Sequence, residues 1–321
     1  MSLLKVENLT TYYETRAGDN QALEEFCIDL NNGETLGLIG ESGCGKSTAG
    51  FSILNMVQPP GKIIAGKVML GGRDIMNLPP EQHRKVLWRE IAMIPQSSMN
   101  SLNPVHKIGK QIVEAILLHN PKTTKEQAKQ KAMELLCQVG LDEKWFDAYP
   151  HKLSGGMKQR VIIAMALSCD PSVLISDEST TGLDVLIQAQ ILALLKRLQK
   201  ERDLSLIMIS HDLHMISSVC TRIGVMYAGY LVEAAPTKEL VKNPYHPYTK
   251  ALFASNIDLK DFGGQVESIE GVVPKLIHPE NRCRFYNRCH NKTERCEGCP
   301  PPLRDIGAGH YVACYREVEH D

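Results

Sequence analysis

The chain has 321 residues, of which 43% are hydrophobic and 23% charged, and these values are typical of a globular protein of about two domains. Its formal net charge of −1 argues against a surface that binds nucleic acid, so we expect no nucleic-acid partner. The apolar run VIIAMAL (161–167) is far shorter than the roughly 20 residues of a membrane helix, and the N-terminal MSLLKVENLT lacks a signal-peptide pattern. We therefore expect no transmembrane segment and a cytoplasmic location.

The first 40 residues are rich in strand signals, with LLKVENL, CIDL and the apolar TLGLIG separated by polar residues that include the turn ETRAGDN. A helix is predicted over 47–56 and a strand over IAMIP (91–95). Further strands are predicted at SVLISDE, SLIMISH and RIGVMYAG, and helices over 157–169, 186–202 and 213–219. This alternation predicts an α/β fold with a parallel sheet and crossover helices.

The pattern changes between residues 96 and 151. There IGKQIVEAILL and KEQAKQKAMELLCQV have helical periodicity with no strand between them, which predicts a helical insertion. After about residue 255 the periodicity fades into a tail rich in Gly, Pro and Cys.

The segment GESGCGKST, Gly40 to Thr48, has the spacing of a phosphate-binding loop and lies between a predicted strand and a predicted helix. Its glycines let successive backbone amides face phosphate oxygens. The charge of Lys46 suits the β and γ phosphates, and the hydroxyl of Ser47 is a ligand for Mg²⁺. A simple glycine-rich turn would not require this full spacing.

Two carboxylates end the predicted strand VLISDE. Asp177 is expected at the strand end near the metal, and Glu178 is expected to face the γ phosphate, where it polarises the attacking water. On their own, such carboxylates would be interpreted as helix caps. Together with the phosphate loop they predict Mg²⁺-assisted hydrolysis of a nucleoside triphosphate.

A second anion-binding pattern occurs at KLSGGMKQR (152–160). Ser154, Gly155 and Gly156 precede an apolar helix, and exposed amides at a helix start favour an anion.

These motifs, in this order, resemble the nucleotide-binding subunits of ABC transporters over residues 1–255, and LSGGMKQR is similar to the signature of that family. The resemblance implies a phosphate-loop NTPase (RecA-like) core over 1–95 and 160–255 that includes an antiparallel β subdomain, and a helical subdomain over 96–159. It leaves residues 256–321 as a small irregular Cys-rich extension.

The resemblance also implies roles for individual residues. It makes Tyr13 the adenine-stacking aromatic, with Tyr12 as the alternative, and His211 the switch histidine that contacts the γ phosphate. It adds Gln96 to Ser47 and Asp177 as a Mg²⁺ ligand. The implied ATP contacts in the same chain are Tyr13, Gly40, Ser42, Gly43, Cys44, Gly45, Lys46, Ser47, Thr48 and Gln96. Those supplied to the ATP of a partner ATPase are Ser154, Gly155, Gly156 and Asp184, so that the active enzyme is expected to be a dimer.

Three residues depart from the family pattern. Ser176 precedes the metal aspartate where the family usually has alanine, Ser179 replaces a proline, and Gly182 replaces a common alanine. These three replacements are expected to affect the stiffness of the loop around Asp177 and Glu178, but not the ability to hydrolyse ATP. Cys44 inside the phosphate loop is a tolerated variant in the family.

The segments NSLNP, DVLIQAQI, NPYHPYTKAL and GVVP resemble the importers of oligopeptides, dipeptides and nickel. The resemblance implies an ATPase subunit at the cytoplasmic face of the inner membrane that powers peptide import. Its expected partners are a second, unlike ATPase, two membrane permeases and, indirectly, a substrate-binding protein. The alternatives are a nickel importer, a non-transport ABC ATPase and an ATP-dependent iron–sulfur carrier.

Five of the ten cysteines lie in the last 39 residues. Ligand chemistry leaves a zinc site and an iron–sulfur cluster open, and the pair Cys296 and Cys299 favours zinc by itself. The wider spacing resembles a motif of dipeptide-importer ATPases that binds a 4Fe-4S cluster. That resemblance implies four ligands and leaves Cys299 spare: Cys283, Cys289, Cys296 and Cys314.

Overall fold

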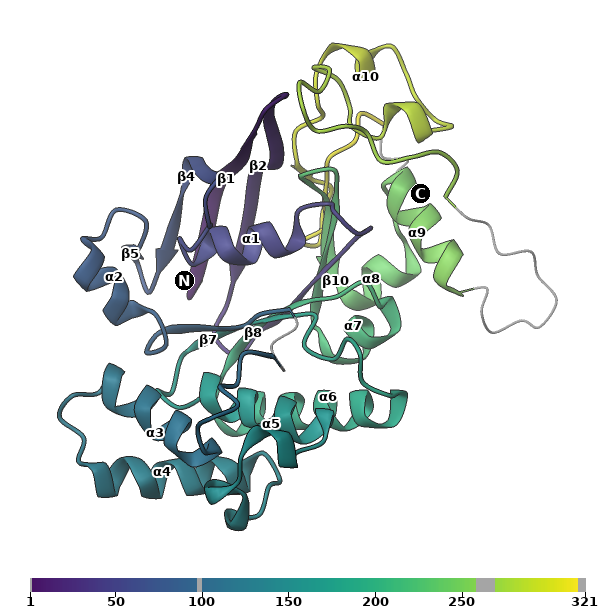
Figure 1. The fold of residues 1–321 in the computed structure, drawn as a ribbon. Coiled ribbons are helices and arrows are strands. Elements are labelled where there is room, and N and C mark those ends of the chain that lie inside the picture. The colour runs from purple at the N-terminus through teal and green to yellow at the C-terminus, as the bar shows by residue number, and fades with distance from the viewer. Residues whose placement is uncertain (1, 97–99, 258–268, 317–321) are drawn as a thin grey trace. The chain divides into compact units, whose positions relative to one another are not determined.

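The computed structural model describes residues 2–96, 100–257 and 269–316 (Figure 1). Residues 97–99 of the predicted helical insertion, and 258–268 and 317–321 of the predicted extension, lie outside this part of the chain. The chain divides into two compact units. Unit 1 comprises Met1–Leu30, Glu34–Asp74 and Ile209–Asp321, and unit 2 comprises Asn31–Gly33 and Ile75–Met208.

Unit 1 contains an antiparallel sheet with the strand order β2-β1-β4-β5. Its strands are β1 (Leu4–Thr15), β2 (Gly18–Leu30), β4 (Gly61–Leu70) and β5 (Arg73–Asp74). Leu4, paired with Leu30 on one side and Leu70 on the other, is fully buried at the start of β1. Helix α1 (Lys46–Ile53) packs against β1 and β2, so the end of the phosphate loop is fixed to this sheet (Figure 1).

A second run of strands in unit 1 has the order β11-β12-β10-β9-β3. The bounds are β3 (Thr35–Ile39), β9 (Arg222–Tyr227), β10 (Tyr230–Pro236), β11 (Arg304–Asp305) and β12 (Tyr311–Val312). Strand β3 is parallel to β9 and buried along its whole length, as expected for a strand covered on both faces. The helices of unit 1 after β8 are α7 (Leu213–Val219), α8 (Thr237–Lys242), α9 (Pro247–Ile257) and α10 (Arg295–Gly298).

Unit 2 contains strands in the order β8-β7-β6, of which β6 and β7 are parallel. Their bounds are β6 (Ile91–Ile94), β7 (Val173–Asp177) and β8 (Ser205–Ile209). The helices are α2 (Pro80–Val86), α3 (Ile108–His119), α4 (Lys125–Gln138), α5 (Gly155–Ala166) and α6 (Val185–Glu201). Helices α3 and α4 pack side by side through buried residues such as Ile112 and Ala132, and both contact α5 (Figure 1).

Residues 269–316, which hold the Cys-rich part of the chain, are mostly irregular. The part of this segment near the C-terminus pairs with the core of unit 1, because β12 adds to the edge of β10 through Val312 and Glu233. The other regular elements within residues 269–316 are β11, a short 3-10 turn at Tyr286–Arg288, and α10.

The predicted order of strands and helices is confirmed for the segments that were assigned. The helix predicted over 47–56 ends earlier, at Ile53, because Asn55 adopts a left-handed backbone conformation with φ of 51°. Strands β4 and β10 were not predicted from the sequence. Among the described residues, no helix is both long and apolar enough to span a membrane.

Candidate active site

The phosphate loop of unit 1 lies between β3 and α1, and neighbouring backbone leaves no room for a side chain at two of its glycines. Gly40 has φ of 151°, and a Cβ there would lie 2.2 Å from the carbonyl oxygen of Met226. A Cβ on Gly45, where φ is 103°, would lie 2.4 Å from the carbonyl oxygen of Ala22. Only glycine fits at both positions, so the close approach of the loop to the strands explains this part of the motif.

Lys46 is almost completely buried within this loop. Its ammonium group donates hydrogen bonds to the carbonyl oxygens of Gly40 at 2.7 Å and Glu41 at 3.0 Å. The positive charge is therefore held at the concave side of the loop, where a phosphate would bind. Burial raises the pKa of the neighbouring Cys44 thiol, which keeps it protonated and chemically unreactive.

Tyr13 and Tyr12 have different surroundings in β1. The ring of Tyr13 flanks Gly61 next to Val57, in the segment that follows α1. Tyr12 donates a hydrogen bond from its hydroxyl to Glu24 at 2.7 Å, and burial is the main reason why its pKa is raised. Tyr13 therefore lies beside the segment that follows α1, whereas the hydroxyl of Tyr12 is engaged by Glu24.

His211 lies in the tight turn that joins β8 to α7 and is exposed. The turn is fixed on both sides of the histidine. The amide of Ser210 donates to Leu38 in β3 at 3.1 Å, and Asp212 caps α7 by accepting from the amide of Met215 at 2.9 Å. The predicted switch histidine is therefore held on a rigid turn that is anchored to the strand preceding the phosphate loop.

In unit 2, Asp177 is fully buried at the end of β7, and Glu178 follows it in a left-handed conformation with φ of 45°. The side-chain amide of Gln96 donates to the Glu178 carboxylate at 2.7 Å, and the hydroxyl of Thr181 donates to the same carboxylate oxygen at 3.3 Å. Two of the predicted Mg²⁺ ligands, Gln96 and Asp177, thus lie beside Glu178. Their amide and carboxylate oxygens are ligand types that suit Mg²⁺.

The two serines that depart from the family pattern contact each other. Ser176 donates from its hydroxyl to the hydroxyl of Ser179 at 2.6 Å, and both residues are buried. This hydrogen bond spans Asp177 and Glu178, so it closes a short side-chain bridge around the two carboxylates. The bridge supplies a restraint at the position where the family has a proline.

Replacing Ser179 by alanine should leave the buried Ser176 hydroxyl without this partner. We expect the unfolding free energy to fall by about 1 kcal/mol and ATP turnover to fall several-fold, because Glu178 loses its restraint. Denaturant unfolding and phosphate release measure the two effects. Ser172→Ala, which removes a hydrogen bond to Glu90 at 2.9 Å near the start of β7, is the matched control and should change stability without changing turnover. Equal turnover losses in the two variants would contradict the bridge.

The signature segment forms the start of α5. Ser154 caps the helix by accepting from the amide of Met157 at 3.3 Å, and Ser154 and Gly155 are exposed. Gly156 is buried, and a Cβ there would lie 2.6 Å from a methyl group of Ile187 in α6. Asp184, also exposed, caps α6 by accepting from the amide of Ile187 at 3.0 Å. The second anion-binding pattern is therefore open to solvent in the single chain.

Four of the five cysteines in the extension line one small pocket in unit 1, and the exposed Cys299 does not: Cys283, Cys289, Cys296 and Cys314. Burial, and secondarily the nearby thiols, raise the pKa of Cys283 to about 12. Within the described residues, however, no group of three or more His, Cys, Asp or Glu side chains is arranged to hold a metal ion. The four predicted ligands thus line the same pocket, but their side chains do not have the arrangement that would hold a metal ion.

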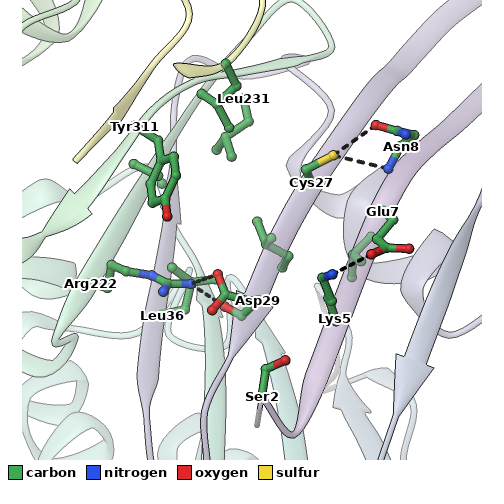
Figure 2. A pocket seen from close by; sticks show the side chains of 15 residues that line it. Ser2, Lys5, Glu7, Asn8, Cys27, Asp29, Leu36, Arg222, Leu231 and Tyr311 are labelled. Atoms are coloured by element: carbon green, nitrogen blue, oxygen red, sulfur yellow. Dashed lines mark hydrogen bonds and ion pairs between the residues drawn. The ribbon is translucent and has the colours of Figure 1, made fainter. Parts of the chain in front are cut away.

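A larger cavity of about 690 Å³ lies elsewhere in unit 1, between strands of its two sheets (Figure 2). Its charged side chains form ion pairs with one another: Lys5 contacts Glu7 at 2.6 Å, and Arg222 contacts Asp29 at 3.1 Å. Because these charges cancel, the cavity lacks the positive field that a nucleotide requires. The phosphate loop remains the candidate nucleotide site.

The segment NPYHPYTKAL, whose sequence resembles the importer group, contacts the phosphate loop. The hydroxyl of Tyr248 accepts a hydrogen bond from the amide of Glu41 at 2.9 Å. The amides of Tyr245 and His246 donate to the buried carboxylate of Glu233, at 2.7 and 2.9 Å, which fixes the segment to β10. The only sequence signal for this contact was the presence of Glu41 within the phosphate-loop motif GESGCGKST.

Comparison with known proteins agrees with this arrangement. Residues 23–181 match the family described as ABC transporter, and residues 232–296 match the oligopeptide/dipeptide transporter C-terminal region. The dipeptide transport ATP-binding protein DppD of Haemophilus influenzae is 41% identical over 96% of this chain and 94% of its own. DppD of Bacillus subtilis is 39% identical over 99% of this chain and 96% of its own.

Among solved structures, the dimeric ATP-binding cassette MJ0796 with ADP and phosphate has a TM-score of 0.64 and 26% identity, and covers 73% of this chain and 98% of that one. The fold is therefore that of an ABC cassette, a phosphate-loop NTPase. With relatives about 40% identical along nearly its whole length, the chain belongs to the ABC transporter family, as an ATP-hydrolysing subunit that carries the C-terminal region of oligopeptide and dipeptide transporters.

Proposed function

We propose that this chain powers the import of dipeptides or oligopeptides through ATP-driven closure of an ATPase dimer on two membrane permeases. The match of residues 232–296 to the oligopeptide/dipeptide transporter C-terminal region carries the assignment of the substrate. The names of the DppD relatives support it. We place the chain on the cytoplasmic face of the membrane, with a substrate-binding protein delivering the peptide to the permeases.

In the proposed ATP site, Tyr13 stacks on adenine and Lys46 neutralises the β and γ phosphates, assisted by the amides of a loop that runs from Gly40 to Thr48. The buried ammonium of Lys46 supports this role. The Mg²⁺ ion would be held by Ser47, Gln96 and Asp177 and would draw charge from the phosphates during hydrolysis. The ATP contacts on the loop are Gly40, Ser42, Gly43, Cys44, Gly45, Lys46, Ser47 and Thr48.

For hydrolysis, we assign Glu178 to orient and polarise the attacking water and His211 to hold the γ phosphate. The hydrogen bonds from Gln96 and Thr181 to the Glu178 carboxylate support its role, because they fix its direction.

Ser154, Gly155, Gly156 and Asp184 are assigned to the ATP held by the partner subunit. Two exposed apolar residues support this dimer, since Val185 and Leu186 directly follow Asp184 and are 81% and 68% exposed. Apolar side chains at such a position favour contact with another protein. The solved cassette MJ0796 is itself dimeric. We propose a second, unlike ATPase as the partner.

We further propose the division into an ATPase domain over 1–255, with a helical subdomain over 96–159 that docks the permeases, and an extension over 256–321. The helical subdomain has an exposed Val105 (74%) available for docking. In the extension, Cys283, Cys289, Cys296 and Cys314 would hold a 4Fe-4S cluster that acts as a structural staple. Their convergence on one pocket supports the cluster, and thiolates are its usual ligands.

Uptake measurements in the host bacterium test the transport function. Cells lacking this chain should lose uptake of radiolabelled dipeptides, and the parent chain should restore it. Lys46→Ala should not restore it, because the variant lacks the charge that binds the phosphates. Uptake of radioactive nickel is the control for the alternative cargo. Loss of nickel uptake with normal dipeptide uptake would contradict the peptide assignment.

A further inference from the structure

The phosphate loop carries an acidic residue whose charge is neutralised from the far end of the chain. Arg288 of the Cys-rich extension binds the Glu41 carboxylate through two hydrogen bonds, from Nη1 at 2.7 Å and from Nη2 at 3.0 Å. The Arg288 side chain is 4% exposed and that of Glu41 is 27% exposed. A two-point pair that is largely shielded from water is stronger and more directional than a surface ion pair.

Arg288 is itself held in place on several sides. It also donates to the backbone carbonyl oxygens of Glu270 at 2.9 Å and Ile269 at 3.0 Å, and to the hydroxyl of Tyr227 at 3.3 Å. Its guanidinium lies over the rings of Tyr227 and Phe285, at 5.6 and 5.9 Å from their centroids. These contacts fix the guanidinium independently of Glu41, so forming the ion pair costs little additional side-chain entropy.

The same aromatic contacts connect the extension to the loop. Phe285 packs edge-on against Tyr227 at 5.2 Å and lies 5.6 Å from the ring of Tyr248. The Tyr248 hydroxyl accepts from the Glu41 amide, so the backbone and the side chain of Glu41 are both held by this group. The carbonyl oxygen of Glu41 in turn accepts from Lys46. A displacement of Arg288 would therefore move Glu41 and, through its carbonyl oxygen, the ammonium group of Lys46.

We propose that Arg288 is a positioning residue of the ATP site, which neutralises Glu41 and fixes the phosphate loop from the Cys-rich extension. An unpaired carboxylate in a loop that binds a triphosphate would repel its ligand, and it would be free to rotate into the anion site. Arg288 directly precedes Cys289, which lines the pocket. A change in the position of Cys289 would therefore move Arg288 and, through the ion pair with Glu41, alter the ATP site. The proposal rests on ATP binding by the phosphate loop.

The test is ATP binding by the full chain, measured by titration with Mg-ATP. Arg288→Ala should raise the Kd about tenfold, or about 1.4 kcal/mol. Glu41→Gln should raise it less than threefold, because it removes the repulsion together with the ion pair. The double variant E41Q/R288A should bind like E41Q, since no carboxylate is left to neutralise. This rescue distinguishes charge control from a general loss of structure.

Arg282→Ala is the matched control. Arg282 also lies in the extension and over an aromatic ring, 4.7 Å from the centroid of Tyr286, but it pairs with Glu280 at 2.7 Å rather than with the loop. It should bind ATP with the parent's Kd. The proposal is overturned if Arg288→Ala binds like the parent or like Arg282→Ala, or if Glu41→Gln fails to rescue it. A parent chain that does not bind ATP would overturn the assignment of the loop as well.

Discussion

Glu178→Gln should reduce ATP turnover by about a hundredfold or more, while ATP binding stays within a few-fold of the parent. The substitution keeps the size and the hydrogen-bonding reach of the side chain but removes its ability to accept a proton. Since ATP then binds without being hydrolysed, the closed dimer should accumulate. Phosphate release under saturating Mg-ATP measures the first effect, and retention of nucleotide on a dimer-sized species in size-exclusion chromatography measures the second.

A matched substitution separates this effect from a general loss of negative charge. Glu201, at the end of α6, contacts Arg197 at 3.8 Å and has a side chain that is 55% exposed. Glu201→Gln should hydrolyse ATP at the parent's rate, because an exposed pair of this kind contributes little. Near-normal hydrolysis by Glu178→Gln would remove Glu178 from the role of base. Loss of ATP binding in that variant would instead point to a role in holding the nucleotide.

Glu178 could be identified from the sequence because it lies in one short segment that contains both the strand pattern and the two carboxylates. Two glycines of the phosphate loop, Gly40 and Gly45, were predictable because a Cβ at either position would collide with neighbouring backbone. Helices α3 and α4 were predictable because their apolar residues repeat at helical spacing over three or more turns. Strand β4 lacks a regular pattern of buried apolar residues, because its apolar residue Ile64 is 54% exposed. Its position in the sheet depends instead on pairing with β1.

The contacts that the sequence could not predict are long-range or involve common residues. Arg288 and Glu41 are 247 positions apart, and a lone arginine and a lone glutamate are usually solvated surface residues. Ser176 and Ser179 were noted as departures, but their hydrogen bond depends on the left-handed turn at Glu178 between them. The site is therefore predictable where one segment contains the chemistry. It is not predictable where folding brings segments together.

The proposed 4Fe-4S cluster predicts that Cys289→Ser removes the iron from the purified chain and raises the Kd for ATP. The parent, purified without oxygen, should be brown and contain about four iron atoms per chain, one for each of the four thiols that line the pocket. A serine hydroxyl is a poor ligand for iron in such a cluster, so the variant should be colourless. Because Cys289 follows Arg288, the loosened segment should also release Glu41, and the Kd should approach that of Arg288→Ala.

Cys299→Ser is the control for this experiment, because it makes the same atomic change in the same extension. The Cys299 thiol is exposed and does not line the pocket, and it contacts the hydroxyl of Tyr315 at 2.8 Å. The variant should keep both the colour and the parent's affinity for ATP. A colourless parent with one zinc per chain would contradict the cluster, whereas a brown parent whose Cys289→Ser variant binds ATP normally would break the connection between the cluster and the phosphate loop. Iron analysis and ATP titration on the same samples separate these outcomes, because the first reports on the pocket and the second on Glu41.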